Sequence, residues 1–182
     1  WYWETKITRA NNINVGLVAA AKINEMYSGM GWDQGSANNA LNVDNSIGIG
    51  YGGNMYEKAG GAQVSTSTTT YDTGDIISIA FNASTGAFRF FKNNVEMTGS
   101  PYTLGDGSYA TTWGVGGAIL PGYRLDGGGG TTKVDCNFGN GYFGTTAVTS
   151  AEADDAGIGA FEYAPPSSHY ALCTKNIKAY GG

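Results

Sequence analysis

A nucleophilic catalytic site needs a base beside its serine or cysteine, and the sequence contains a single histidine, His169. This histidine follows Pro165-Pro166-Ser167-Ser168, a run typical of a surface corner, so we expect an exposed histidine in a turn. The two cysteines, Cys136 and Cys173, lie far apart in the chain. We expect two separate thiols, because a disulfide needs Cα atoms within roughly 7 Å and sequence does not show that distance.

Paired carboxylates are the second chemistry to consider, because glycosidases on sandwich folds use two carboxyl groups roughly 5 to 10 Å apart. Glu4, Asp75 and Asp135 lie on or beside predicted strands, but the chain has no E-x-D-x-x-E-like cluster. We therefore expect each of the three to have an ordinary role on a solvent face or at a turn. A carbohydrate-active enzyme is the least favoured of the functions considered, and we expect no catalysis.

The metal-binding potential of the chain is limited to loop aspartates. No pair of cysteines or histidines has the spacing of zinc ligands. Aspartates in loops rich in Gly and Asn can gather oxygen ligands for calcium, and four fit this description: Asp33, Asp44, Asp106 and Asp126. Because Asp is also an ordinary turn residue, we expect no cofactor, with calcium as the alternative.

Composition predicts one large all-β domain. The 182 residues include 30 glycines, 41% are hydrophobic and only 14% are charged, a profile of many short strands and tight loops. The net charge of −5 would repel a phosphate backbone, so we expect no nucleic-acid partner. No stretch approaches the roughly 20 apolar residues of a membrane span. The chain opens at Trp1 inside a strand-like pattern, and we expect a domain excised from a longer polypeptide.

Strand periodicity is clearest at two places. Trp1, Trp3, Thr5 and Ile7 share one face of a predicted half-buried strand. Residues 71–95 predict an antiparallel hairpin, with strands over 75–81 and 87–92, a turn over 82–86, and Phe88 and Phe90 facing inward.

Turn residues and composition predict the structure of several other segments. Residues 22–45 and 121–124 are expected to be loops. Residues 150–156 are the only stretch with a helix-like start, and a last strand is expected near 170–174.

Four short motifs occur in order: Trp1-Tyr2-Trp3-Glu4, Thr73-Gly74-Asp75, Phe90-Phe91-Lys92-Asn93-Asn94-Val95 and Asn137-Phe138-Gly139. Together they resemble a SPRY domain over residues 1–143. The resemblance implies a two-sheet antiparallel β-sandwich with jelly-roll-like topology, used as a non-catalytic binding module with variable loops. Residues 144–182 would then be an extension that packs back on the sandwich.

The tail adds a second resemblance. Phe161-Glu162-Tyr163-Ala164-Pro165-Pro166 and Ala171-Leu172-Cys173-Thr174 are similar to segments of SPRY-containing proteins from bacteriophages and marine viral genomes, which are assigned to virion structure. This resemblance implies a module exposed on a virus particle, as part of a larger virion polypeptide or oligomer.

The leading hypothesis is therefore a recognition module of a tail fibre, spike or capsid decoration, which binds a host-surface glycan or protein, or neighbouring virion subunits. The alternative is a purely structural capsid or fibre assembly domain. Loop aromatics beside Asn, Asp and Gly suit sugar stacking or peptide anchoring. The predicted ligand-binding residues are Tyr27, Trp32, Tyr51, Tyr56, Tyr102, Tyr123 and Arg124.

Overall fold

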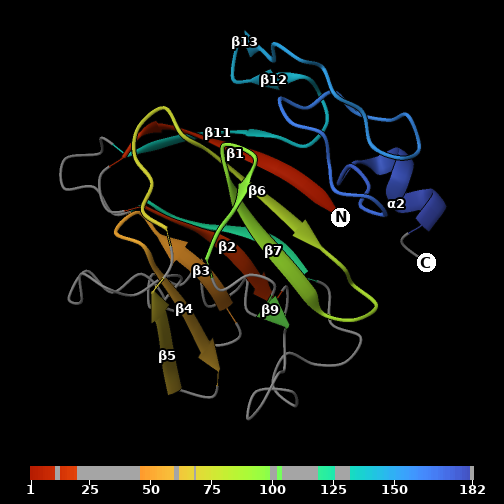
Figure 1. Cartoon of the computed structure of the whole chain (residues 1–182). Helices are drawn as coiled ribbons and strands as arrows, with labels where there is room; N and C mark the ends of the chain where they lie inside the picture. The colour runs from red at the N-terminus through yellow and green to blue at the C-terminus, as the bar shows by residue number, and fades with distance from the viewer. Residues whose placement is uncertain are drawn as a thin grey trace. The chain divides into compact units, whose positions relative to one another are not determined.

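The chain forms two compact units, and each is described by itself. The first comprises Trp1–Thr8, Gly74–Tyr102 and Val134–Gly182, and the second comprises Arg9–Thr73 and Thr103–Lys133. The structure is a computed structural model (Figure 1), which describes residues 1–10, 13–19, 46–59, 62–67, 69–98, 102–103, 119–125 and 132–180.

The main sheet of the first unit has the strand order β11-β1-β6-β7-β8, and β9 also pairs with β7. The pairs β1–β6, β6–β7 and β7–β8 are antiparallel. Its strands are β1 (Tyr2–Arg9), β6 (Ile76–Phe81), β7 (Ala87–Lys92), β8 (Val95–Glu96), β9 (Tyr102–Thr103) and β11 (Lys133–Asn137).

The predicted hairpin is confirmed as β6 and β7. Phe88 and Phe90 are fully buried, and their rings meet edge to face with centroids 5.5 Å apart. The turn over 82–86 begins with Asn82, whose side-chain oxygen accepts hydrogen bonds from the backbone N–H groups of Ser84 and Thr85. Asn93 and Asn94 then have φ angles of 48° and 66°, a left-handed conformation that asparagine tolerates. Local sequence therefore fixes this element.

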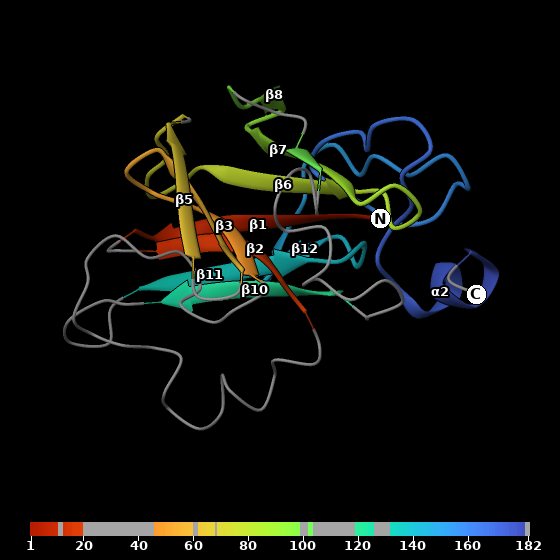
Figure 2. The same cartoon turned by 90° about the horizontal axis from the view of Figure 1, so that it is seen from below.

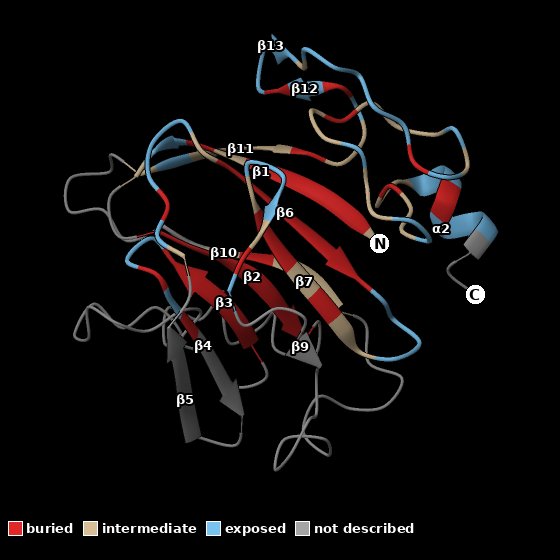
Figure 3. Cartoon of the chain, in the orientation of Figure 1, coloured by how far each residue is buried: buried red, intermediate tan, exposed pale blue. Residues whose placement is uncertain are grey.

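Strand β1 is predicted correctly in position but not in burial. Trp3, Thr5 and Ile7 are buried as expected, yet Tyr2 and Glu4 on the opposite face are buried as well. Figure 3 shows the start of β1 as a continuous buried stretch. The half-buried pattern is therefore wrong for the first part of the strand, because the C-terminal segment of the same unit covers its second face (see below).

The sheet of the second unit is antiparallel throughout, with the strand order β10-β2-β3-β4-β5. Strands β2 and β3 are buried along their whole length. Its strands are β2 (Ile13–Ala19), β3 (Ser46–Gly50), β4 (Asn54–Ala59), β5 (Ala62–Ser67) and β10 (Ile119–Leu125).

Side chains alternate across this second sheet. Val15 pairs with Ile49 and Leu17 with Ile47, and these four residues form an apolar face. The neighbouring row is glycine on three adjacent strands: Gly122, Gly16 and Gly48. A side chain at Gly16 would collide with the β3 backbone, since a Cβ there would lie 1.9 Å from the carbonyl oxygen of Ile47. Glycine is therefore required for β2 and β3 to approach this closely.

The C-terminal segment of the first unit is largely irregular. It contains the small hairpin of β12 (Tyr142–Phe143) and β13 (Thr146–Ala147), and the helix α2 (Thr174–Tyr180). The strand expected near 170–174 is reduced to an isolated parallel bridge between Tyr2 and Ala171. The expected helical turn over 150–156 is also wrong: Ala151 has a φ of 52° and Glu152 forms an antiparallel bridge with Phe161.

The predicted all-β class with two antiparallel sheets is confirmed, since α2 is the one helix among the residues that the structure describes. Jelly-roll packing of the sheets, the SPRY resemblance and a domain boundary at residue 143 stay predictions. In the part of the chain that is described, no helix is long and apolar enough to cross a membrane.

Candidate functional site

The predicted ligand-binding residues fall into three groups. Tyr27 and Trp32 lie outside the described residues, as do the four candidate calcium aspartates. Tyr51 follows the end of β3 in an exposed turn. The other predicted residues lie within strands rather than in loops: Tyr56 in β4, Tyr102 in β9, and Tyr123 and Arg124 in β10.

The loop expected at residues 121–124 is therefore wrong, because these residues belong to β10. Pro121 has no N–H to donate, but among the described strands β10 is at the end of its sheet, where proline is tolerated. Arg124 of β10 pairs with Asn14 of β2, and Asn14 also pairs with Gly50 of β3 on its other side. The structure thus brings Arg124 and Tyr51, which follows Gly50, to the same end of the sheet.

The Tyr51 turn, which we define as residues 51–54, is held by backbone hydrogen bonds on both sides. The N–H of Tyr51 donates to the carbonyl of Ile13 at 3.0 Å, and its own carbonyl accepts from the N–H of Tyr71 at 3.1 Å. Gly53, with a φ of 81°, donates to Gly50 and closes the turn. These bonds fix the backbone that carries the Tyr51 ring.

The side chain of Tyr71 also stabilises the Tyr51 turn. Its ring is buried, and its hydroxyl lies 3.0 Å from the carbonyl oxygen of Ile13 and 2.8 Å from that of Ile49. Burial raises the pKa of Tyr71 well above its ordinary value, so this hydroxyl remains a donor at physiological pH. This role of Tyr71 is not predictable from the sequence, because a lone tyrosine after the Thr-rich run at residues 66–70 has no pattern that indicates it.

The Tyr51 turn offers an accessible aromatic surface. Tyr51 is 43% exposed, and it is the one exposed large hydrophobic residue among the described residues of the second unit. Gly52 is exposed with open space where a side chain would be, and Asn54 is exposed as well. Asp72, next to the Tyr71 that bonds the turn, is also exposed. An exposed aromatic face suits stacking on a sugar ring or a flat peptide group.

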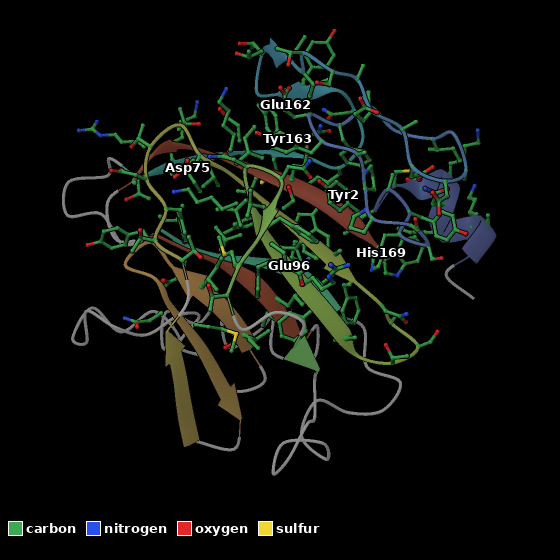
Figure 4. All side chains as sticks on the ribbon, viewed as in Figure 1. Tyr2, Asp75, Glu96, Glu162, Tyr163 and His169 are labelled. Carbon is green, nitrogen blue, oxygen red and sulfur yellow. The ribbon has the colours of Figure 1, made fainter. Side chains whose placement is uncertain are left out.

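A buried carboxylate, Glu4, is the centre of a polar cluster in the first unit. Glu4 is 0% exposed, so the expected role on a solvent face is wrong. Its Oε1 accepts from the Tyr2 hydroxyl at 3.1 Å and the Tyr163 N–H at 2.8 Å. Its Oε2 accepts from Asn137 Nδ2 at 3.3 Å and the Glu162 N–H at 2.9 Å. Figure 4 shows Tyr2, Glu162 and Tyr163, which come from β1 and from the C-terminal segment.

The environment of Glu4 is structural rather than catalytic. Burial raises the pKa of Glu4 above its ordinary value of 4.5, and the four hydrogen bonds oppose that increase. Asn137 continues the network, since its Oδ1 accepts from the N–H groups of Gly139 and Gly141. With both oxygens hydrogen-bonded and no exposed surface, Glu4 has no access to a substrate. The expectation of ordinary roles does hold for Asp75, which pairs with Lys92 at 3.0 Å, and for Asp135, which accepts from Thr8 at 2.9 Å.

Asp154 is a second buried carboxylate that organises the C-terminal segment. Its Oδ1 accepts from the N–H groups of Ala156 and Ile158, and its Oδ2 accepts from the Ala171 N–H and from Asn176 Nδ2, all within 2.8–2.9 Å. Burial tends to raise the pKa of Asp154, but these hydrogen bonds outweigh burial and hold the pKa below its ordinary value of 3.8. The carboxylate therefore fixes the loop before residue 158 to the start of α2.

Acid should weaken this arrangement. Because the folded-state pKa of Asp154 is depressed, its stabilisation is present above the ordinary value of 3.8 and is lost as the pH falls through the folded value. The raised pKa of Glu4 acts in the opposite sense, since its contribution is largest at low pH and falls as the pH rises. We expect the wild type to gain more stability than Asp154→Asn between low pH and about pH 6, because the variant keeps the Glu4 contribution and loses that of Asp154. Urea titrations from about pH 3 to pH 6 measure this, and equal slopes would contradict the assignment.

The remaining side chains considered for chemistry are His169, Cys136 and Cys173. His169 is half-buried rather than exposed in its turn; its Nδ1 lies 3.1 Å from the Ser167 carbonyl oxygen, and burial lowers its pKa. Cys136 and Cys173 are not joined by a disulfide, as expected. Among the described residues, no three His, Cys, Asp or Glu side chains are arranged to hold a metal ion.

Comparisons with known proteins add no family to this description. No protein-family model matches the sequence, and no curated protein is significantly similar to it.

Proposed function

We propose that this chain is a non-catalytic recognition module that binds a glycan or a protein segment through the Tyr51 turn. The observation that carries the proposal is the combination of an exposed aromatic ring with a backbone fixed by hydrogen bonds to Ile13, Gly50 and Tyr71. A preformed aromatic surface binds with a smaller loss of conformational entropy than a mobile one. The resemblance to SPRY domains supports the same class of function.

A location on a virion, in a tail fibre, spike or capsid decoration, is the second part of the proposal. It rests on the similarity of residues 161–166 and 171–174 to phage and marine viral proteins. A host-surface glycan or protein, or a neighbouring virion subunit, would then be the ligand. A purely structural assembly domain remains the alternative, and the oligomeric state of the protein separates the two.

The test is a glycan array followed by calorimetric titration of any glycan that binds. We expect Tyr51→Ala to weaken binding about thirtyfold, the loss typical of an aromatic residue at the centre of an interface. Tyr142→Ala is the matched control, because Tyr142 is similarly exposed at 48% but belongs to the first unit. It should leave the affinity unchanged.

Two results would overturn this proposal. Full affinity of Tyr51→Ala, with loss of binding in Tyr142→Ala, would place the ligand on the first unit. No binding on the array, together with a stable symmetric oligomer in light scattering, would favour the assembly role.

A further inference from the structure

The two ends of the described chain lie beside each other in the first unit. Tyr2, at the start of β1, forms a parallel bridge with Ala171, which precedes α2 by three residues. The Tyr2 N–H donates to the Tyr170 carbonyl at 2.8 Å, and the Leu172 N–H donates to the Tyr2 carbonyl at 3.1 Å. Figures 1 and 2 both place the start of β1 next to this segment.

Side chains reinforce this bridge from both strands. Glu4, two residues into β1, accepts from the backbone of residues 162 and 163. Asp154 accepts from the Ala171 N–H at 2.8 Å. Asn176 in α2 donates to both Asp154 and the Ala171 carbonyl, at 2.8 and 3.1 Å. The helix is thereby tied to the same residue that bridges to Tyr2.

The contact is also shielded from water. The rings of Tyr2 and Phe161 meet edge to face with centroids 4.9 Å apart, and both belong to one buried apolar cluster with Ala80, Phe91 and Ala171. Water has little access to hydrogen bonds beside such a cluster. When one of these bonds breaks, no water molecule replaces the lost partner, and the barrier to rupture is therefore higher.

We propose that this terminal clamp, defined as the Tyr2–Ala171 bridge with its Glu4 and Asp154 hydrogen bonds, is a mechanical device that resists tension applied between the two ends of the chain. The two segments of the bridge run parallel, so such tension pulls β1 from its start and the C-terminal segment from its end. The two segments must then slide past each other along their axes. Sliding loads together the bonds that cross between them, from Tyr2 and Glu4 to the C-terminal segment, whereas peeling would break them one by one.

The function that follows is to keep the first unit folded under load, as a domain within a fibre or spike would require. This inference is independent of ligand binding at the Tyr51 turn, because all of its residues belong to the first unit. It depends on the direction of the clamp strands and not on their thermodynamic stability alone.

The experiment is single-molecule force spectroscopy of the whole chain in two pulling geometries. In the first, load is applied between the two ends. In the second, it is applied between the N-terminal end and Ser84→Cys, in a Cys136→Ser and Cys173→Ser background that is used for both geometries. Ser84 is exposed at the tip of the β6–β7 turn, and Tyr2 pairs with Ala80 in an antiparallel register. The second geometry therefore peels β1 from β6.

We expect the folded lifetime at equal load to be at least about tenfold longer in the end-to-end geometry, because rupture under force follows the unfolding barrier. Equal lifetimes, or a longer one in the peeling geometry, would overturn the proposal. Leu172→Pro removes the N–H that donates to Tyr2. It should shorten the end-to-end lifetime about fivefold to tenfold and leave the peeling lifetime within about twofold. An equal effect in both geometries would reduce the clamp to an ordinary stabilising contact.

Discussion

Replacement of Glu4 by alanine is expected to lower the free energy of unfolding by roughly 3–5 kcal/mol. The variant leaves four donors facing the vacated site: the Tyr2 hydroxyl, the Asn137 amide and the backbone N–H groups of Glu162 and Tyr163. Buried donors without partners are costly, and this cost exceeds what is regained by no longer burying a carboxylate. Urea-induced unfolding followed by circular dichroism measures the change.

The matched control for this prediction is Glu152→Ala. Glu152 is an exposed glutamate of the same unit, so its replacement should change the free energy of unfolding by no more than about 0.5 kcal/mol. Glu4→Gln should fall between the two, because it keeps one acceptor oxygen but points an amide N–H₂ group at two donors. A loss below about 1 kcal/mol in Glu4→Ala would show that the C-terminal segment does not depend on this carboxylate.

Replacement of Gly16 by alanine is expected to destabilise the second unit by about 3 kcal/mol, the upper end of the usual range for overpacking. The added Cβ would lie 1.9 Å from the carbonyl oxygen of Ile47 and 2.5 Å from the Cα of Gly48. Both atoms belong to the β3 backbone, so the methyl group can be accommodated only by moving β2 and β3 apart. That movement would lengthen the hydrogen bonds of the central pair of the sheet.

Two other glycines calibrate the Gly16 result. Gly48→Ala should cost less, because its nearest neighbour, the Val15 carbonyl oxygen, lies at 3.0 Å. Gly52→Ala should be neutral within about 0.5 kcal/mol, because no atom lies within 4 Å of the added methyl group. Thermal unfolding of the three variants gives the order directly. If Gly16→Ala were as stable as Gly52→Ala, the close approach of β2 and β3 would be contradicted.

The two buried carboxylates explain how a long irregular tail becomes part of a β domain. Glu4 accepts hydrogen bonds from the backbone N–H groups of residues 162 and 163. Asp154 joins the loop at 156–158 to Ala171 and Asn176 in the same way. Neither site has access to a substrate, and both use their oxygen atoms to satisfy backbone N–H groups that lack a strand partner. Both carboxylates belong to the first unit, whereas the Tyr51 turn, at which we propose binding, belongs to the second.

Elements with local sequence signals could be predicted without the structure. The all-β class, strand β1 and the β6–β7 hairpin follow from a period of two and from turn residues such as Asn82, Asn93 and Asn94. The same reasoning found Tyr51 as an accessible turn aromatic. These features depend on neighbours within a few positions, so a pattern in the chain is enough to predict them.

The burial of polar residues and their hydrogen-bond partners could not be predicted in this way, because they depend on the tertiary fold. Glu4 has the pattern of a solvent-facing strand residue, and its partners Glu162 and Tyr163 lie more than 150 positions further along the chain. The row of Gly122, Gly16 and Gly48 likewise appears only when three strands are set in register. The strand expected near residue 171 became a single bridge, because the chain turns directly after it: the Cys173 N–H donates to the Ala171 carbonyl and α2 begins at Thr174. Burial and register depend on residues that are distant in the sequence, and a local pattern cannot predict these contacts.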